Sequence, residues 1–315
     1  MKILKKILAS SLLLAGTFVW AGPWDSFLSN YDSTVAGINS GMDDFATQLS
    51  IAIPQAATQQ NVWADAYIGK LLPSVPPHLG GGVNVGFTHI NTAGLAKAAS
   101  ALNISGVQDS YYYPVFTGDL RIGGLFLPFD LDVSFMKTGQ INANFISDIT
   151  VDFLTLGLEG RYALLEGGVI QPRVSIGFGY FYNQGSLMAN ADAAQAGVNY
   201  KIHTMYVSAQ VSKTILFITP FAGVRALVSK CDNTWEWSIK DSTAVAALTA
   251  TDKATGGFGS VVTEEFDLNA FQPQFYFGAA FRFLVLDLTA SVSTDLRHIS
   301  DSKLWSGNVS LRVSI

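Results

Sequence analysis

The stretch VIQPRVSIGFGYFY, residues 169–182, alternates between apolar residues and polar or glycine residues along most of its length. A repeat of two is the pattern of a β-strand whose two faces meet different surroundings. One face would carry the apolar set and the other the polar set, with Ile170, Pro172, Val174, Ile176, Phe178, Tyr180 and Tyr182 against Gln171, Arg173, Ser175, Gly177 and Gly179.

Nine further segments between residues 80 and 315 repeat this alternation, and the connections between them alternate in length. Outer-membrane barrels have an even number of strands, short periplasmic turns and longer extracellular loops, which a soluble β-sandwich need not have. The sequence therefore predicts an all-β fold, a transmembrane antiparallel up-and-down β-barrel of about ten strands. The short connections are expected at 125–128, 165–168, 213–214 and 282–284, and the long ones at 91–110, 139–147, 185–198, 230–263 and 299–303.

Composition favours the same class of protein. Hydrophobic residues make up 49% of the chain and aromatic residues 12%, yet no run of eighteen apolar residues follows residue 21. Short strands with one face in lipid produce this combination. Three of the 19 basic residues lie in the first six positions, so 16 remain against 24 acidic ones. This balance gives no indication of a nucleic-acid partner.

The N-terminus has the layout of a secretory signal. Lys2, Lys5 and Lys6 precede an apolar run over residues 7–14, and the small residue Ala21 precedes Gly22. The apolar run is too short to cross a bilayer. We predict a signal peptide over residues 1–21, removed on export.

The spacing of apolar residues is different in residues 22–79. There they recur at steps of three and four, as on an amphipathic helix. No Lys or Arg occurs in residues 22–69, so attraction to anionic lipid cannot hold this segment. We expect a helical plug or periplasmic cap with a proline-rich link, the alternative being a loose extension. Residues 62–69 could instead add a strand. The apolar face of the plug helix would consist of Trp24, Phe27, Leu28, Tyr31, Val35 and Ile38.

Charged residues on the polar faces of the strands would point into the lumen, where the two signs nearly balance. Balanced charges favour a salt-bridged closed interior; a narrow solute passage and gated lateral release are the alternatives. The charged residues predicted to line the lumen are Asp119, Arg121, Asp130, Asp132, Glu159, Arg161, Arg173, Arg225, Arg282, Asp287, Asp295, Arg297 and Arg312.

Few residues suggest chemistry. His298 lies near Asp295 and two serines at the predicted extracellular end, a combination that could act as an acid/base pair. Short polar loops carry such residues by chance, so we expect no enzyme. The four histidines show no metal spacing, no phosphate-binding loop is present, and we expect neither metal nor cofactor. The single cysteine, Cys231, is expected to be a free thiol.

The final segment places Trp305, Val309, Leu311, Val313 and Ile315 on one face. It resembles the C-terminal assembly signal of Gram-negative-type outer-membrane β-barrel proteins, although that signal usually ends in Phe where this chain has Ile315. The resemblance implies insertion by the barrel-assembly machinery. In style the chain is similar to small transport barrels of the OmpW and FadL kind.

The leading hypothesis for function is passage of small solutes or hydrophobic molecules across the bacterial outer membrane, with residues 80–315 as the barrel. Outer-membrane lipid, the assembly machinery and the transported molecules would be its partners. One alternative is an adhesin or structural barrel with a closed lumen and binding loops. A second alternative is a membrane-embedded hydrolase that uses His298.

Overall fold

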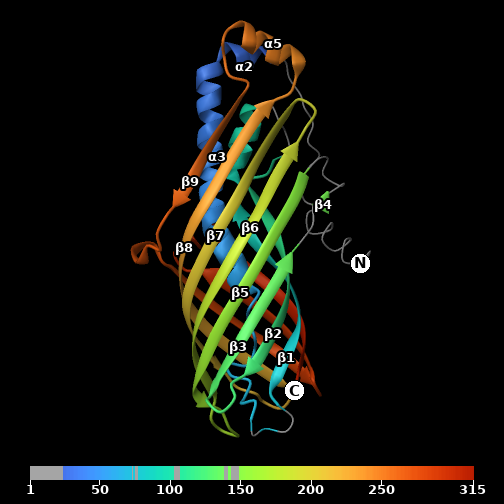
Figure 1. Cartoon of the computed structure of the whole chain (residues 1–315), viewed down its shortest axis with the longest axis vertical. Coiled ribbons are helices and arrows are strands. Elements are labelled where there is room, and N and C mark those ends of the chain that lie inside the picture. Colours follow the sequence, from blue (N-terminus) through green and yellow to red (C-terminus); the bar gives the residue numbers. More distant parts are fainter. Residues whose placement is uncertain (1–23, 73, 75–76, 103–106, 138–140, 143–148) are drawn as a thin grey trace.

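A computed structural model describes residues 24–72, 74, 77–102, 107–137, 141–142 and 149–315, so the expected signal peptide lies outside the described residues. Within them, ten antiparallel strands close into a barrel (Figure 1), because β10 pairs with β8 as well as with β11. The predicted ten-stranded transmembrane barrel is confirmed. Its strands are, in sheet order, β10 (Gln272–Phe283), β11 (Leu286–Asp295), β12 (Trp305–Ser314), β1 (Leu79–Asn91), β2 (Ser110–Gly123), β3 (Phe129–Lys137), β5 (Ile149–Glu166), β6 (Arg173–Asn190), β7 (Ala194–Ser212) and β8 (Ile218–Ile239).

The barrel wall is apolar outside and polar inside. Ile176 and Phe178 of β6 are 47% and 56% exposed, whereas Ser175 beside them is 1% exposed. The neighbouring strands repeat this pattern, with Val133 and Leu158 exposed. A soluble protein does not leave so large an apolar surface in water, whereas a bilayer covers it. The alternation in sequence therefore arises because one face of each strand meets lipid.

Four strands are much longer than a membrane crossing requires. A tilted strand crosses the bilayer with roughly 9–11 residues, and β5, β6, β7 and β8 have 18, 18, 19 and 22. Their extra length lies at the end with the long connections (Figure 1). The prediction of a long loop over residues 185–198 is therefore wrong, because β6 and β7 stay paired up to Asn190 and Gln195.

Part of the expected 230–263 loop is also strand: β8 runs on to Ile239 and pairs with β9 (Gly256–Thr263). A two-residue strand, β4 (Ile141–Asn142), pairs with β5. The remaining connections at this end carry α4 (Ala93–Ala101), α5 (Ser242–Ala250) and the short η1 (Leu268–Ala270).

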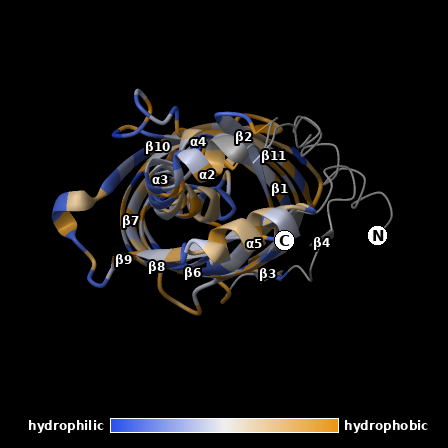
Figure 2. Ribbon diagram, turned by 90° about the horizontal axis from the view of Figure 1, so that it is seen from above, coloured by the Kyte–Doolittle hydropathy of each residue, from blue (hydrophilic) through white to orange (hydrophobic). Residues whose placement is uncertain are grey.

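The N-terminal segment runs lengthwise through the barrel. α2 (Asp25–Ser29) and the start of α3 (Tyr31–Gln59) lie among the long connections, and α3 descends inside the ring of strands (Figure 2). Irregular chain then continues to β1 at the opposite, short-turn end, so residues 62–69 form no strand. No helix among the described residues has the length and apolar character to cross a membrane.

Beyond the membrane, the elements at the long-connection end form what we call the outer head: α2, the first half of α3, α4, α5, β9 and the extensions of β5–β8. Its interior is apolar, unlike that of the membrane part. Trp235 and Trp237 of β8 are buried there, and their Nε1 atoms donate to Asp43 Oδ1 at 2.7 Å and Asn39 Oδ1 at 2.9 Å. The buried cluster includes Phe27, Ile38, Met42, Phe45, Leu49, Ile202, Trp235, Trp237 and Leu248.

The helix face expected to plug the barrel lies in this head. Phe27 and Ile38 are buried in its cluster, and Trp24, Leu28, Tyr31 and Val35 pack against it. Helical periodicity identified the face, but it could not indicate which end of the barrel the face would meet. The helix begins at the end opposite to the short turns.

Two glycines let α3 and α4 touch. A Cβ atom on Gly41 would lie 2.5 Å from the carbonyl oxygen of Gly94 and 3.0 Å from the backbone nitrogen of Ala98. α3 is continuous through Gly41, and the missing side chain at this position permits the close approach of α4. At Gly37, one helical turn earlier, an added Cβ would meet nothing within 4 Å.

Replacing Gly41 with Val is expected to destabilise the folded protein by about 1–3 kcal/mol, because α4 must move away from α3. The matched control is Gly37→Ala, which should be neutral or stabilise by about 0.5–1 kcal/mol through helix propensity alone. The stability of both variants is measured by heating the protein and quantifying the loss of the fast-migrating folded band on gels. Equal stability of the two variants would contradict the packing assignment.

Candidate functional site

The most distinctive site is the lumen, where one segment of the chain is held by its backbone. We call residues 58–68, the end of α3 and the irregular chain after it, the lumen segment. Nine successive carbonyl oxygens of this segment accept hydrogen bonds from side chains of six wall strands. The donors are Arg225 to Thr58, Asn308 to Gln59, Asn84 to Gln60, Arg161 to Asn61, Arg312 to Val62, Gln210 to Trp63 and Ala64, and Arg121 to Asp65 and Ala66, at 2.6–3.2 Å.

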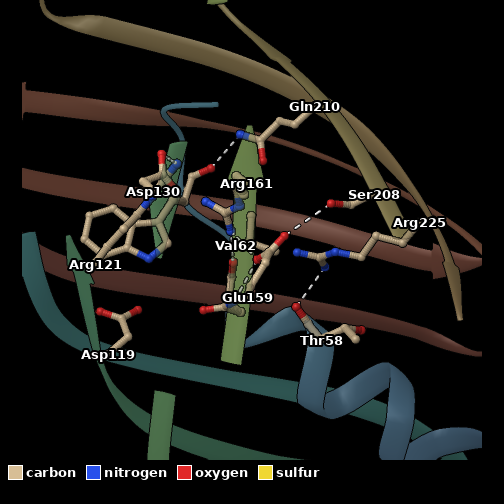
Figure 3. A network of polar contacts seen from close by, with 12 residues as sticks. Thr58, Val62, Asp119, Arg121, Asp130, Glu159, Arg161, Ser208, Gln210 and Arg225 are labelled. Carbon is tan, nitrogen blue, oxygen red and sulfur yellow. Dashed lines mark hydrogen bonds and ion pairs between the residues drawn. The ribbon is translucent and has the colours of Figure 1, made fainter. Parts of the chain in front are cut away.

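These contacts have a clear physical cause. The last carbonyls of a helix have no partner within it and carry partial negative charge. The irregular chain that follows has no neighbouring strand, so its carbonyls would be buried without hydrogen bonds. Wall arginines and amides supply them from every side (Figure 3).

Each of three wall arginines also pairs with a wall carboxylate. Arg121 donates to both oxygens of Asp130, at 2.8 and 2.7 Å, and neither side chain is exposed. Arg161 Nη2 donates to one oxygen of Glu159, Oε2, at 2.5 Å, and Arg312 Nε donates to Asp119 at 2.8 Å. The carboxylates hold the guanidinium groups in place, so that each presents its remaining N–H groups to the lumen segment.

Aromatic rings support the arginines from the side. The ring of Trp63, on the lumen segment, lies 4.4 Å from the guanidinium carbon of Arg312 and 5.5 Å from that of Arg121. Arg225 lies 4.4 Å from the ring of Tyr276. Cations over aromatic faces gain further stabilisation when both are buried.

Asp65 fixes the lower end of the lumen segment. Its carboxylate bridges Arg173 and Arg282, and Arg282 also pairs with Asp287. Below it, at the short-turn mouth, Lys70 Nζ lies 3.0 Å from Glu166. The segment is therefore tied to the wall from the end of α3 to the mouth.

Asp65 also completes the charge balance of the interior. Between the end of α3 and the mouth, the described wall carries six arginines and five acidic residues, so it has one excess positive charge without the segment. The set is Arg121, Arg161, Arg173, Arg225, Arg282 and Arg312 against Asp119, Asp130, Asp132, Glu159 and Asp287.

Some buried polar atoms beside the segment have no hydrogen-bond partner among the described residues. Both carboxylate oxygens of Asp132, Nε and Nη2 of Arg225, and the hydroxyl of Tyr206 belong to this group. The interface between segment and wall is thus largely polar but not fully paired, and Val62 and Ala64 of the segment pack in an apolar cluster with Phe221, Tyr276 and Ala280 of the wall.

The structure places twelve of the thirteen predicted lumen charges inside the barrel, with Arg173 and Arg282 partly exposed near the mouth. Arg297 is the exception: it is exposed, and its guanidinium donates to the carbonyls of Asn269 and Phe271. It follows β11 in a turn, where strand alternation no longer sets direction. Sequence reasoning missed Asp65, Trp63 and the amides of Asn84, Gln210 and Asn308.

His298 and Asp295 do meet, with His298 Nδ1 3.0 Å from Asp295 Oδ2. Asp295 also accepts from the backbone N–H groups of Arg297 and His298 and from Gln272. This carboxylate therefore organises the turn after β11. Among the described residues, no group of three or more His, Cys, Asp or Glu side chains is placed to hold a metal ion.

No family model matches the chain, and no curated protein matches its sequence. Solved structures resemble its fold. The outer membrane protease OmpT from Escherichia coli aligns over 76% of this chain and 97% of its own, at 7% identity and a TM-score of 0.45. A Pseudomonas aeruginosa FadL homologue covers 82% and 97%, at 9% identity and a TM-score of 0.26. A mutant of the monoaromatic hydrocarbon channel TodX covers 84% and 97%, at 10% identity and 0.26.

These similarities are of outer-membrane barrel architecture alone. By its own closed sheet and apolar outer wall, the chain is an outer-membrane-type β-barrel.

Proposed function

We propose that this protein is a closed barrel of the bacterial outer membrane that anchors the outer head at the cell surface, where the head serves as a binding or structural element. The observation that carries the proposal is the row of nine carbonyl contacts that fixes the lumen segment to the wall.

The energetics favour a closed resting state. A net hydrogen bond contributes about 0.5–1.5 kcal/mol, and one to a charged donor about 1.5–3 kcal/mol. Displacing the whole lumen segment would break nine such contacts and the Asp65 ion pairs, which amounts to at least roughly 10 kcal/mol. Thermal motion alone does not open such a lumen.

The outer head supports a surface role. Strands β5–β8 continue far past the membrane, and α3 joins them through a buried apolar cluster, so the head is rigidly continuous with the barrel. A rigid scaffold that carries connecting loops is a common basis for binding surfaces. We propose no enzymatic reaction, since Asp295 is occupied by its own turn.

The experiment is single-channel recording of the refolded full-length chain in planar bilayers, with a heat-modifiable gel band as proof of folding. We expect no steady current, because protein atoms fill the lumen. A stable open channel formed by the folded full-length protein would overturn the proposal.

Passage of small solutes is the second candidate. It is favoured by the polar atoms of Asp132, Arg225 and Tyr206 that have no hydrogen-bond partner among the described residues. Among these three side chains, only Nη1 of Arg225 holds the lumen segment, through the carbonyl of Thr58. Under this hypothesis, movement of the segment would open a narrow polar route. Gated current from the full-length protein would favour this candidate over the closed anchor.

A further inference from the structure

We propose that the barrel is the route by which the protein's own N-terminal segment crosses the outer membrane. The translocated substrate would be unfolded polypeptide, namely the part of this chain that precedes the lumen segment. The inference goes beyond the anchoring role, but it rests on the proposed placement of the outer head outside the cell.

Contacts of Tyr31 and Leu71 establish the direction in which the N-terminal part of the chain runs through the barrel. Tyr31 Oη donates to the carbonyl of Ala254 at 2.8 Å in the outer head, far along the chain from α3. At the other end, the backbone N–H of Leu71 donates to Gly124 at 2.8 Å, beside the short turn between β2 and β3. The chain therefore enters β1 at the short-turn mouth, while α2 and α3 begin at the opposite mouth.

The closed wall leaves only one path between these positions. β1 pairs with both β12 and β2, and β8 pairs with β10, so no gap in the described sheet lets the segment pass sideways. An outer-membrane chain approaches from the periplasm, where short turns lie. Once the barrel is closed, the residues of α2 and of the first half of α3 reach the long-connection end only by travelling through the lumen.

The composition of the segment suits this route. Residues 24–69 contain five Asp and no Lys or Arg. Between the short-turn mouth and the level of Gln59, the wall they pass carries six arginines and five carboxylates among the described residues. A passing acidic chain therefore meets attraction rather than repulsion from the wall. A basic residue in transit would face six wall arginines, four of them buried.

Folding of the outer head can supply the driving force. Once outside, Phe27, Ile38, Met42, Phe45 and Leu49 become buried against β7, β8 and α5. Burial of large apolar side chains is strongly favourable and would prevent the segment from sliding back. No external energy source is needed for a single crossing.

The test is labelling of intact cells with a membrane-impermeant maleimide. Ala36→Cys places a thiol on an exposed position of α3, Thr249→Cys marks exposed α5 in the outer head, and Val169→Cys marks the turn between β5 and β6, which is 99% exposed. The unmodified chain, whose Cys231 is buried, gives the background. We expect Ala36→Cys and Thr249→Cys to react on intact cells and Val169→Cys to react only after permeabilisation.

The outcomes separate the two proposals. Reaction at Thr249→Cys without reaction at Ala36→Cys would overturn translocation but leave the surface anchor standing. Reaction at Val169→Cys alone would show an inverted barrel and overturn both. If Ala36→Cys does not give the folded gel band, Ser33→Cys, also exposed on α3, takes its place.

Discussion

A barrel that lacks residues 24–72 is expected to conduct ions across a planar bilayer, whereas the full-length protein is expected to be silent. Eight strands already give an interior that side chains just fill, so ten strands leave width for a further chain segment. In this protein the lumen segment occupies that width. Its removal leaves six arginines against five carboxylates in the wall between the level of Gln59 and the short-turn mouth, so this part of the pore should favour anions somewhat over cations.

The control for this truncation is a synthetic peptide of residues 55–72, which should reduce the current when added to the short-turn side. Folding of the truncated barrel is established by heat-modifiable gel mobility before recording. A correctly folded truncated barrel that remains silent would show that the wall side chains alone seal the lumen.

The Arg121→Leu substitution is expected to lower the free energy of unfolding by about 3–5 kcal/mol, because it leaves the buried carboxylate of Asp130 unpaired. It also removes the donors to the carbonyls of Asp65 and Ala66. Urea unfolding in lipid vesicles, followed by tryptophan fluorescence, measures the change.

The double variant Arg121→Leu, Asp130→Leu distinguishes the two contributions. Replacing both members of a buried ion pair with apolar residues is often close to neutral, so the double variant should recover a substantial part of the lost stability. What it does not recover reports on the contacts to the lumen segment, including the backbone N–H of Ile68 that donates to Asp130. If the double variant is no more stable than Arg121→Leu, the ion-pair explanation fails.

Much of the barrel could be predicted from sequence, because lipid and lumen impose opposite polarity on alternate residues of each strand. The same rule placed Arg121, Arg161 and Arg312 inside. It failed at Arg297, where the strand has ended, and over residues 185–198, where paired strands continue into the outer head.

The site itself was harder to predict for two physical reasons. The lumen segment after Gln59 is irregular, so it has no period to detect. Its main contacts use backbone oxygens, which every residue type possesses, so no sequence signal records them. The wall strands, unlike the segment, did carry a sequence signal for these contacts. On the polar faces of β1, β7 and β12, the donors Asn84, Gln210 and Asn308 are amides in place of the usual Ser, Thr or charged residue.

The backbone contacts also determine which parts of this protein can tolerate sequence drift. A carbonyl oxygen survives any substitution at Val62, Trp63 or Ala64, whereas loss of Gln210 or Arg121 removes two contacts at once. For these backbone contacts, mutational constraint is therefore concentrated in the wall. Within the segment it falls on the side chains that themselves contact the wall, such as Asn61, Trp63 and Asp65.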